Sequence, residues 1–393
     1  MSKILYTSNI YHILTYVDID GVWSNEKIVT CMNVLIKKNP ILKRKITEKN
    51  GLFFFKKVKT FKLTDYYNFE YTKQENFNNY IPDLLNVEFT TESKWKSLWC
   101  VDKEAKKTRL FFKIHHAYAD GYKVIAMLSS FLITEEKDLT KKFKRTNGCS
   151  ILKKIYYYIV GTILLFLMNI RVLSNILFNI TGRQTFKSKK TAYIICKPLN
   201  LYEIKTAGIA RNFTVNDFLY ALMVKTDRLY QKKDRIITSC SPINVSSGVS
   251  QTNNICIMVN QTNNAYDNST LLKRVNSTFN NYKYSWYIPI LNSVINKITS
   301  YINLDRLLLY YNNILDNCDY IFSNVIGPTS SEYNVNIHFL LTAKNNEIIY
   351  NIISSGNRVN IICSFKEGII ADKGRFEQCI YTAFDSLMEN KEK

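Results

Sequence analysis

The chain has 393 residues, 46% of them hydrophobic, which is enough to bury the cores of two domains of roughly 200 residues each. Its 53 Lys and Arg outnumber 32 Asp and Glu, and the net charge of +21 predicts attraction to anions. No nucleic-acid reading module is visible, so a membrane surface is favoured over nucleic acid as the anionic partner. The nine cysteines show neither a CxxC pair nor metal-ligand spacing, so we expect reduced thiols, no metal site and a cytosol-facing protein.

The first 150 residues alternate predicted helices and strands. Ser24 or Asn25 can cap a helix that runs through IVTCMNVLI and ends before Pro40. GLFFFKKV and, later, TRLFFKI at 108–114 are typical of strands, the second nearly continuous in apolar residues and therefore buried. GYKVIAMLSSFLI, from residue 121, has the apolar spacing of a packed helix. The N-terminus lacks the apolar core and cleavage site of a secretory signal.

Two of the four histidines, His115 and His116, follow the predicted strand at 108–114 in the heptad HHAYADG, with Asp120 and Gly121 at its end. A strand end can present an imidazole to a cavity, and imidazole is a competent general base near neutral pH. No Ser or Cys nucleophile stands beside it, so the heptad indicates direct activation of a substrate hydroxyl. The alternative is an ordinary core or surface histidine pair whose spacing arises by chance.

Residues 151–180 form the most hydrophobic segment, and 155–170 is an uncharged run of 16 residues, short of the roughly 20 that a spanning helix needs. Three interpretations remain open, namely a marginal span, a helix in or re-entering the membrane interface, and a buried core helix. A single span would separate two halves that share one active site. We therefore favour in-plane or re-entrant association, helped by the flanking basic runs at 141–145 and 187–190.

A second α/β segment begins near residue 190. Thr214 and Asp217 have the spacing of a capping box at the start of a helix through FLYALMVKTDRLY, and this structural explanation of Asp217 suffices on its own. EIIYNIIS and RVNIICSF flank Gly356 as a predicted hairpin. A final helix is expected from about Lys373.

HHxxxDG resembles the motif of the acyl-coenzyme A-dependent acyltransferase superfamily, and further elements resemble the wax ester synthase/diacylglycerol acyltransferase (WS/DGAT) family. These elements occur in the order of that family and cover nearly the whole chain. The hydrophobic segment precedes GRQTFK, where plant and animal members carry a membrane segment. Two departures are Ser97, in place of the proline of PLW, and Ser246, in place of the arginine of the central strand. The elements are NPILKRKI (39–46), SLW (97–99), VNDFLYALMVKTDRLY (215–230), SPINV (241–245), QTNNICIMV (251–259) and SNVIGP (323–328).

The resemblance implies a mixed α/β fold of two chloramphenicol acetyltransferase-like domains around a substrate tunnel. We expect an N-terminal domain at 1–150, a membrane-associating insertion at 151–190 and a C-terminal domain at 191–393. By family position His116 is the general base, Asp120 holds the loop through a buried ionic contact, and His115 and Gly121 complete the catalytic motif. Asn216, Asp217 and Asn324 are the candidates for substrate binding, with Asn216 or Asn324 as oxyanion donor.

The implied reaction is O-acyl transfer from a long-chain acyl-coenzyme A, a co-substrate rather than a bound cofactor, to a fatty alcohol or diacylglycerol. Alternatives are acylation of another small alcohol, a sterol or an amine, and a catalytically silent acyl-lipid-binding protein of the same fold. The expected partners are these substrates and a membrane surface, without nucleic acid. A membrane-associated, cytosol-facing location follows, at the endoplasmic reticulum if the source is eukaryotic.

Overall fold

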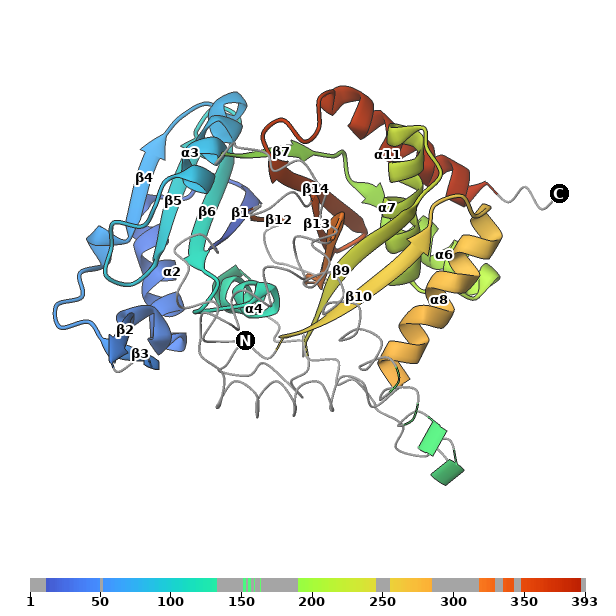
Figure 1. Ribbon diagram of the computed structural model, residues 1–393. Coiled ribbons are helices and arrows are strands. Elements are labelled where there is room, and N and C mark those ends of the chain that lie inside the picture. Colours follow the sequence, from blue (N-terminus) through green and yellow to red (C-terminus); the bar gives the residue numbers. More distant parts are fainter. Residues whose placement is uncertain are drawn as a thin grey trace.

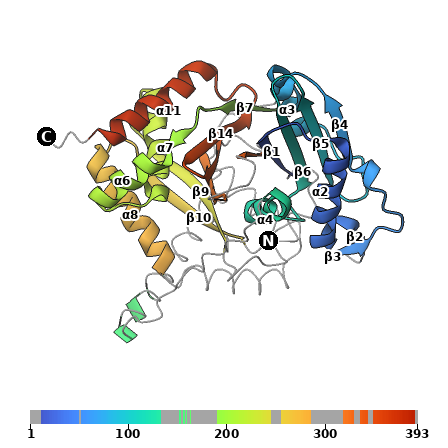
Figure 2. The same cartoon turned by 180° about the vertical axis from the view of Figure 1, so that it is seen from behind.

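The computed structural model describes residues 12–49, 52–132, 151–152, 155–156, 159, 163, 190–244, 255–284, 318–328, 335–342 and 348–389. These residues form two lobes, each built on a β-sheet with helices packed against it (Figure 1). The view from behind in Figure 2 shows the same separation. The expected mixed α/β class is confirmed.

The N-terminal lobe contains a five-stranded sheet in the order β12-β1-β6-β5-β4, in which only β4 and β5 are parallel. Its apolar residues pack against α2 and α4 on one face, while α3 lies over the other face (Figure 1). The strands are β1 (His12–Asp20), β4 (Tyr67–Tyr71), β5 (Trp95–Asp102), β6 (Lys107–His115) and β12 (Asn336–Leu341); the helices are α2 (Asn25–Lys38), α3 (Tyr80–Asn86) and α4 (Gly121–Leu132), with short 3₁₀ turns at Pro40–Lys43, Leu63–Asp65 and Gln74–Asn79.

Local sequence signals set the boundaries of this lobe as predicted. The Ser24 hydroxyl accepts a hydrogen bond from the Lys27 amide at the start of α2, and the helix ends before Pro40, which cannot continue it. The predicted strand at 51–58 forms β3 (Leu52–Lys57), which pairs only with β2 (Arg44–Lys49) in a separate two-stranded hairpin.

The C-terminal lobe contains a sheet in the order β10-β9-β11-β13-β14-β7, with β8 paired to β14. Helices α6, α7, α8 and α11 cover the sheet, and their apolar faces bury its larger core (Figure 1). The strands are β7 (Thr191–Ile195), β8 (Leu199–Asn200), β9 (Ile236–Asn244), β10 (Ile255–Asn263), β11 (Tyr320–Ile326), β13 (Ile348–Ser355) and β14 (Arg358–Lys366); the helices are α6 (Leu201–Arg211), α7 (Val215–Gln231), α8 (Asn268–Tyr284) and α11 (Lys373–Met388).

The predicted elements of this lobe are also confirmed. Thr214 and Asp217 form the complete capping box of α7. β13 and β14 form the predicted hairpin, and Gly356 at its turn has φ +57°, a conformation that glycine adopts without a Cβ penalty. The last helix begins at Lys373.

One strand joins the two lobes. β12 follows β11 in the chain, yet it pairs with β1 of the N-terminal sheet. Its other edge is satisfied by side chains of the C-terminal lobe: Asn360 donates to the Ile337 carbonyl (2.8 Å), and Ser364 donates to the Leu341 carbonyl (2.7 Å). The Asn351 amide oxygen accepts from the Leu341 amide (3.1 Å). Part of the predicted 191–393 segment therefore completes the sheet of the first lobe.

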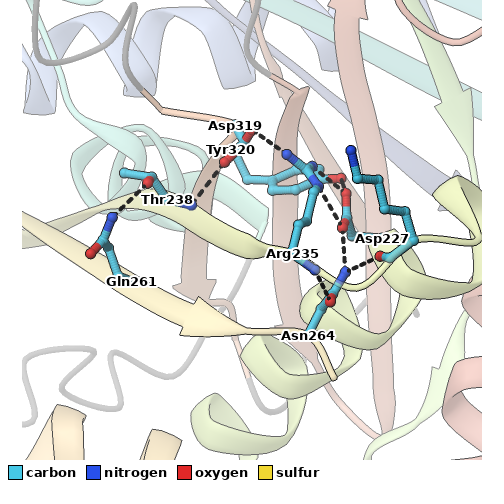
Figure 3. Close-up of polar contacts among 8 residues, drawn as sticks. Asp227, Arg235, Thr238, Gln261, Asn264, Asp319 and Tyr320 are labelled. Carbon is cyan, nitrogen blue, oxygen red and sulfur yellow. Dashed lines mark hydrogen bonds and ion pairs between the residues drawn. The ribbon is translucent and has the colours of Figure 1, made fainter. Parts of the chain in front are cut away.

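A buried ionic network ties together α7, β9, β10 and β11 (Figure 3). Asp227 is fully buried and receives two hydrogen bonds from the Arg235 guanidinium, at 2.5 and 3.0 Å. Asn264 and the hydroxyl of Tyr320 also donate to Asp227. Arg235 further binds Asp319 at 2.7 Å. Burial alone would lower the pKa of Arg235, but the hydrogen bonds and charge of Asp227 together with the charge of Asp319 hold that pKa above its usual value.

Two histidines are buried in structural positions of the N-terminal sheet. His12 Nε2 lies 2.7 Å from the Leu85 carbonyl oxygen, and His338 stacks on Tyr16 with 4.5 Å between ring centroids. Burial lowers the pKa of each to about 3, aided at His12 by the charge of Lys113 and at His338 by that of Arg109.

We expect this burial to make the protein acid-labile. Both histidines stay neutral when folded and protonate near pH 6.5 when unfolded, so the free energy of unfolding should fall as the pH drops below 6.5. The expected slope is about 2.7 kcal/mol per pH unit for the pair. Urea denaturation between pH 7 and 5 measures it, and a His338→Asn variant should show about half the contribution. An unchanged slope in that variant would contradict the assignment.

The predicted insertion at 151–190 lies largely outside the described residues. Within the part of the chain that is described, no helix combines the length and apolarity needed to cross a bilayer. Six apolar side chains of the segment are described, and all are 51% to 79% exposed: Ile151, Leu152, Ile155, Tyr156, Ile159 and Ile163. The seven cysteines whose side chains the structure describes are free thiols.

Candidate active site

The HHAYADG loop leaves β6 at its last residue and enters α4 at Gly121. His115 is 2% exposed and belongs to the turn itself: its Nδ1 accepts from the Ala117 amide (3.2 Å), and its carbonyl accepts from the Tyr118 amide (2.9 Å). His12 stands directly opposite it on β1. The first histidine of the motif thus shapes the loop and directs the second.

His116 is the most solvent-accessible residue of the segment 109–120, whose other members are buried. It nevertheless lies deep in the protein, where burial lowers its pKa and the carboxylate of Asp120 opposes that effect. The lowered pKa keeps the ring neutral, the form that can accept a proton, at neutral pH and somewhat below.

Asp120 caps α4. Its Oδ1 accepts from the Lys123 amide (2.8 Å), and its backbone carbonyl accepts from the Val124 amide (2.9 Å). The family resemblance implied an ionic contact of Asp120, and its charge acts on His116 and Lys123, opposing the fall in pKa that burial causes in each. The carboxylate also fixes the loop through the helix N-terminus, where its charge favours the helix dipole.

Gly121 brings the two lobes into contact. A Cβ at this position would lie 3.0 Å from Cγ2 of Val325 on β11. The next residue, Tyr122, hydrogen-bonds to the backbone of Ile326 on the same strand. A side chain at 121 would require Val325 to shift, so the glycine favours the close approach of α4 and β11.

The close approach of α4 and β11 brings Asn324 toward the histidine loop. Asn324 lies within β11, and its Nδ2 donates to Oδ1 of Asn216 on the first turn of α7 (3.1 Å). The buried Oδ1 of Asn324 has no hydrogen-bond partner within the described structure. The two candidate oxyanion residues therefore form one pair, and a joint rotation of both amides would turn the unpartnered acceptor into a donor.

Asp217 points away from this pair. Its Oδ2 accepts from the Thr214 amide and from Asn276 on α8, both at 2.8 Å, and it is 2% exposed. Oδ2 of the carboxylate thus caps α7 and anchors α8, and Asp217 follows Asn216 directly in the chain.

Tyr118, a residue that the sequence did not indicate, holds the histidine loop against the β2–β3 hairpin. Its hydroxyl donates to the Arg44 carbonyl (2.9 Å) and accepts from the Lys94 amide (3.2 Å), while Phe55 packs edge-on against its ring at 4.9 Å. The only hint in the sequence was an aromatic residue inside the motif. No group of three or more potential metal-ligating side chains occurs among the residues that the structure describes.

Comparison with known proteins confirms the resemblance to the WS/DGAT family. Residues 253–388 match the sequence profile of the WS/DGAT C-terminal domain. This region includes β10, β11 with Asn324, the strand that joins the lobes, and α11. No curated protein matches the chain at the level of sequence.

Several solved structures share the fold over almost the whole chain. The wax ester synthase/diacylglycerol acyltransferase from Marinobacter aquaeolei VT8 is 12% identical with a TM-score of 0.62, covering 98% of this chain and 97% of that one. TRI3 trichothecene 15-O-acetyltransferase from Fusarium sporotrichioides is 9% identical with a TM-score of 0.67, covering 98% and 94%. The starter condensation domain of rhizomide synthetase, solved with C8-CoA, is 11% identical with a TM-score of 0.56, covering 98% and 91%. The expected two-domain acyltransferase fold is thereby confirmed.

Proposed function

We propose that this protein, which carries a WS/DGAT C-terminal domain, is an acyltransferase that moves a long-chain acyl group from acyl-coenzyme A to a lipid alcohol, with His116 as the general base. A fatty alcohol would give a wax ester, and diacylglycerol would give triacylglycerol. The observation that carries the proposal is the position of His116, deep in the protein yet accessible, on a loop whose turn and helix cap hold it in place.

The chemistry needs one base and one hydrogen-bond donor. His116 takes the proton of the alcohol as its oxygen attacks the thioester carbonyl, forming a carbon–oxygen bond and a tetrahedral oxyanion. Collapse of this intermediate breaks the carbon–sulfur bond, and the imidazolium returns the proton to the departing thiolate. The lowered pKa of His116 suits the first step, because the ring begins neutral.

The paired amides of Asn216 and Asn324 supply the second requirement. One Nδ2 is committed to their mutual hydrogen bond, and the partner amide remains for a ligand. A donor fixed by such a pair is preorganised and stabilises charge as it develops in the transition state. The starter condensation domain solved with C8-CoA supports acyl-coenzyme A as the donor substrate in this fold.

A membrane surface is the expected place of action, because both lipid substrates partition there. Ile151, Ile155, Ile159 and Ile163 recur every four residues and are all at least half exposed, which is the pattern of one apolar helix face. An apolar face next to basic runs fits a helix lying in the membrane interface. We propose a membrane-associated, cytosol-facing enzyme on this basis.

A panel of acceptors tests the proposal. Purified protein is incubated with radiolabelled palmitoyl-coenzyme A and hexadecanol, diacylglycerol, a sterol or a primary amine, and neutral lipids are separated by thin-layer chromatography. We expect label in wax ester, triacylglycerol or both. Product only with the sterol or amine would replace the acceptor class. Binding of the thioester without any product would favour the silent lipid-binding alternative.

A further inference from the structure

The β2–β3 hairpin concentrates positive charge. Residues 43–62 hold eight Lys and Arg and a single acidic residue, Glu48, so a third of the net charge of +21 lies in about a twentieth of the chain. Acidic residues are also absent from 139–202, but the cations of that stretch are spread over 64 residues, whereas eight lie within 20 residues here. The cations are Lys43, Arg44, Lys45, Lys49, Lys56, Lys57, Lys59 and Lys62.

The register of the hairpin places like charges opposite one another. Arg44 faces Lys57, and Lys45 faces Lys56. Like charges in directly opposed positions destabilise a strand pair. Lys45 is neutralised by an ion pair with Glu92, but Arg44, Lys56 and Lys57 are exposed. The repulsion within this hairpin would be relieved if an anionic partner bound to its surface.

An aromatic side chain lies among these cations. Phe54 on β3 is 41% exposed and pairs in register with Thr47, two residues from Lys56 on the same strand and two from Lys49 across the register. Its neighbour Phe55 points the other way, into the core. An exposed phenylalanine ring flanked by lysines fits a membrane surface, with the ring at the boundary between headgroups and acyl chains and the cations beside lipid phosphates.

The hairpin is directly connected to the catalytic loop. Tyr118, two residues after His116, donates to the Arg44 carbonyl of β2 and packs against Phe55 of β3. In Figure 1 the hairpin lies at the lower left of the molecule, and the described residues between 151 and 163 (green) lie at the lower right.

We propose that the β2–β3 hairpin docks onto an anionic lipid bilayer and that Tyr118 transmits this placement to the His116 loop. The inference rests on the proposed function in that it names the surface through which that site meets its lipid. An extended bilayer suits these residues better than a single soluble phosphate, because the exposed cations are distributed along both strands and accompany an exposed aromatic ring, whereas one phosphate requires donors that converge on a point.

The test compares two triple variants of the full chain with equal loss of charge. Lys49→Gln/Lys56→Gln/Lys57→Gln removes hairpin cations, and Lys205→Gln/Lys233→Gln/Lys273→Gln removes three exposed lysines of the C-terminal lobe. Flotation with vesicles of phosphatidylcholine and phosphatidylserine measures partitioning. Each cation near an anionic surface contributes about five-fold, so the hairpin variant should bind about 100-fold more weakly, and the control should bind as the wild type does. Equal losses in both variants would show only a response to net charge and overturn the proposal.

A second variant reports the depth of the hairpin. Phe54→Trp adds an indole at the exposed position, and its emission is obtained as the difference from the wild-type protein. We expect a blue shift with anionic vesicles and quenching by lipids brominated near the headgroup. Emission unchanged by vesicles would overturn the proposal. A raised KM for soluble acyl-coenzyme A in the lysine variant, with vesicle binding intact, would assign the hairpin to the nucleotide instead.

Vesicle binding and indole emission test membrane docking of the hairpin independently of acyl transfer. Vesicle binding and indole emission require no acyl transfer, so they stand if the substrate panel gives no product. Conversely, turnover of a short-chain soluble alcohol should be the same in both triple variants, and turnover of vesicle-embedded diacylglycerol should fall only in the hairpin variant.

Discussion

Replacement of His116 by asparagine is expected to lower acyl transfer by about 10²- to 10⁴-fold, the usual contribution of a positioned general base. Asparagine retains polarity and fits the space but cannot accept the hydroxyl proton. Because burial lowers the pKa of His116, wild-type turnover should persist below the ordinary value of 6.5 and decline only as the pH falls through the lowered pKa. Initial rates with the best acceptor of the panel, measured across pH, test both statements.

The matched control is His338→Asn. His338 is also a buried histidine, but it lies in β12 and stacks on Tyr16 of β1. We expect it to lose stability and retain chemistry, whereas His116→Asn should retain the far-ultraviolet spectrum and lose chemistry. Full turnover in the His116 variant would remove the proposed mechanism. Equal loss of turnover in both variants would indicate damage to the fold rather than to the base.

Replacement of Arg235 by methionine should lower the free energy of unfolding by about 3–5 kcal/mol. The substitution leaves Asp227, which is fully buried, without the guanidinium that binds both of its oxygens. Asn264 and Tyr320 still donate to the carboxylate, but neither carries a compensating charge. The same change also releases Asp319 at the start of β11, which carries Asn324. Urea denaturation at pH 7 gives the value.

Two further variants serve as controls for the loss of stability expected in Arg235→Met. Lys107→Met breaks an ion pair whose side chains are 40% and 47% exposed, and such surface pairs contribute at most about 1 kcal/mol. Asp227→Asn/Arg235→Met removes both charges of the buried pair and should be less destabilising than Arg235→Met alone. A double variant as unstable as the single one would mean that packing, and not the unpaired charge, sets the cost.

The sequence predicted several elements of this fold from local signals. The caps at Ser24 and Thr214, the stop before Pro40 and the turn at Gly356 each depend on chemistry within a few residues. The order of motifs also led to the acyltransferase fold. The loop of His116 was placed correctly at a strand end because an apolar run precedes it.

Contacts between distant segments could not be predicted in the same way. The hydrogen bond of Asn216 and Asn324 joins residues 108 positions apart, and the brace of Tyr118 on Arg44 joins residues 74 apart. Neither contact produces a periodic pattern in the sequence from which it could be predicted. Asp120 and Asp217 show the opposite problem, since a carboxylate near a helix start has the same pattern whether it caps the helix or binds a ligand. Geometry assigns both to caps.

The route of β12 also limits how the two lobes can move. β12 is hydrogen-bonded to β1 along one edge and to the side chains of Asn351, Asn360 and Ser364 along the other. A hinge opening of the two lobes would therefore break hydrogen bonds on one edge of this strand. Under the proposed function, lipid substrates would therefore have to reach His116 without such an opening of the lobes. For the same reason a fragment ending before residue 335 would expose a bare strand edge on β1 and tend to aggregate.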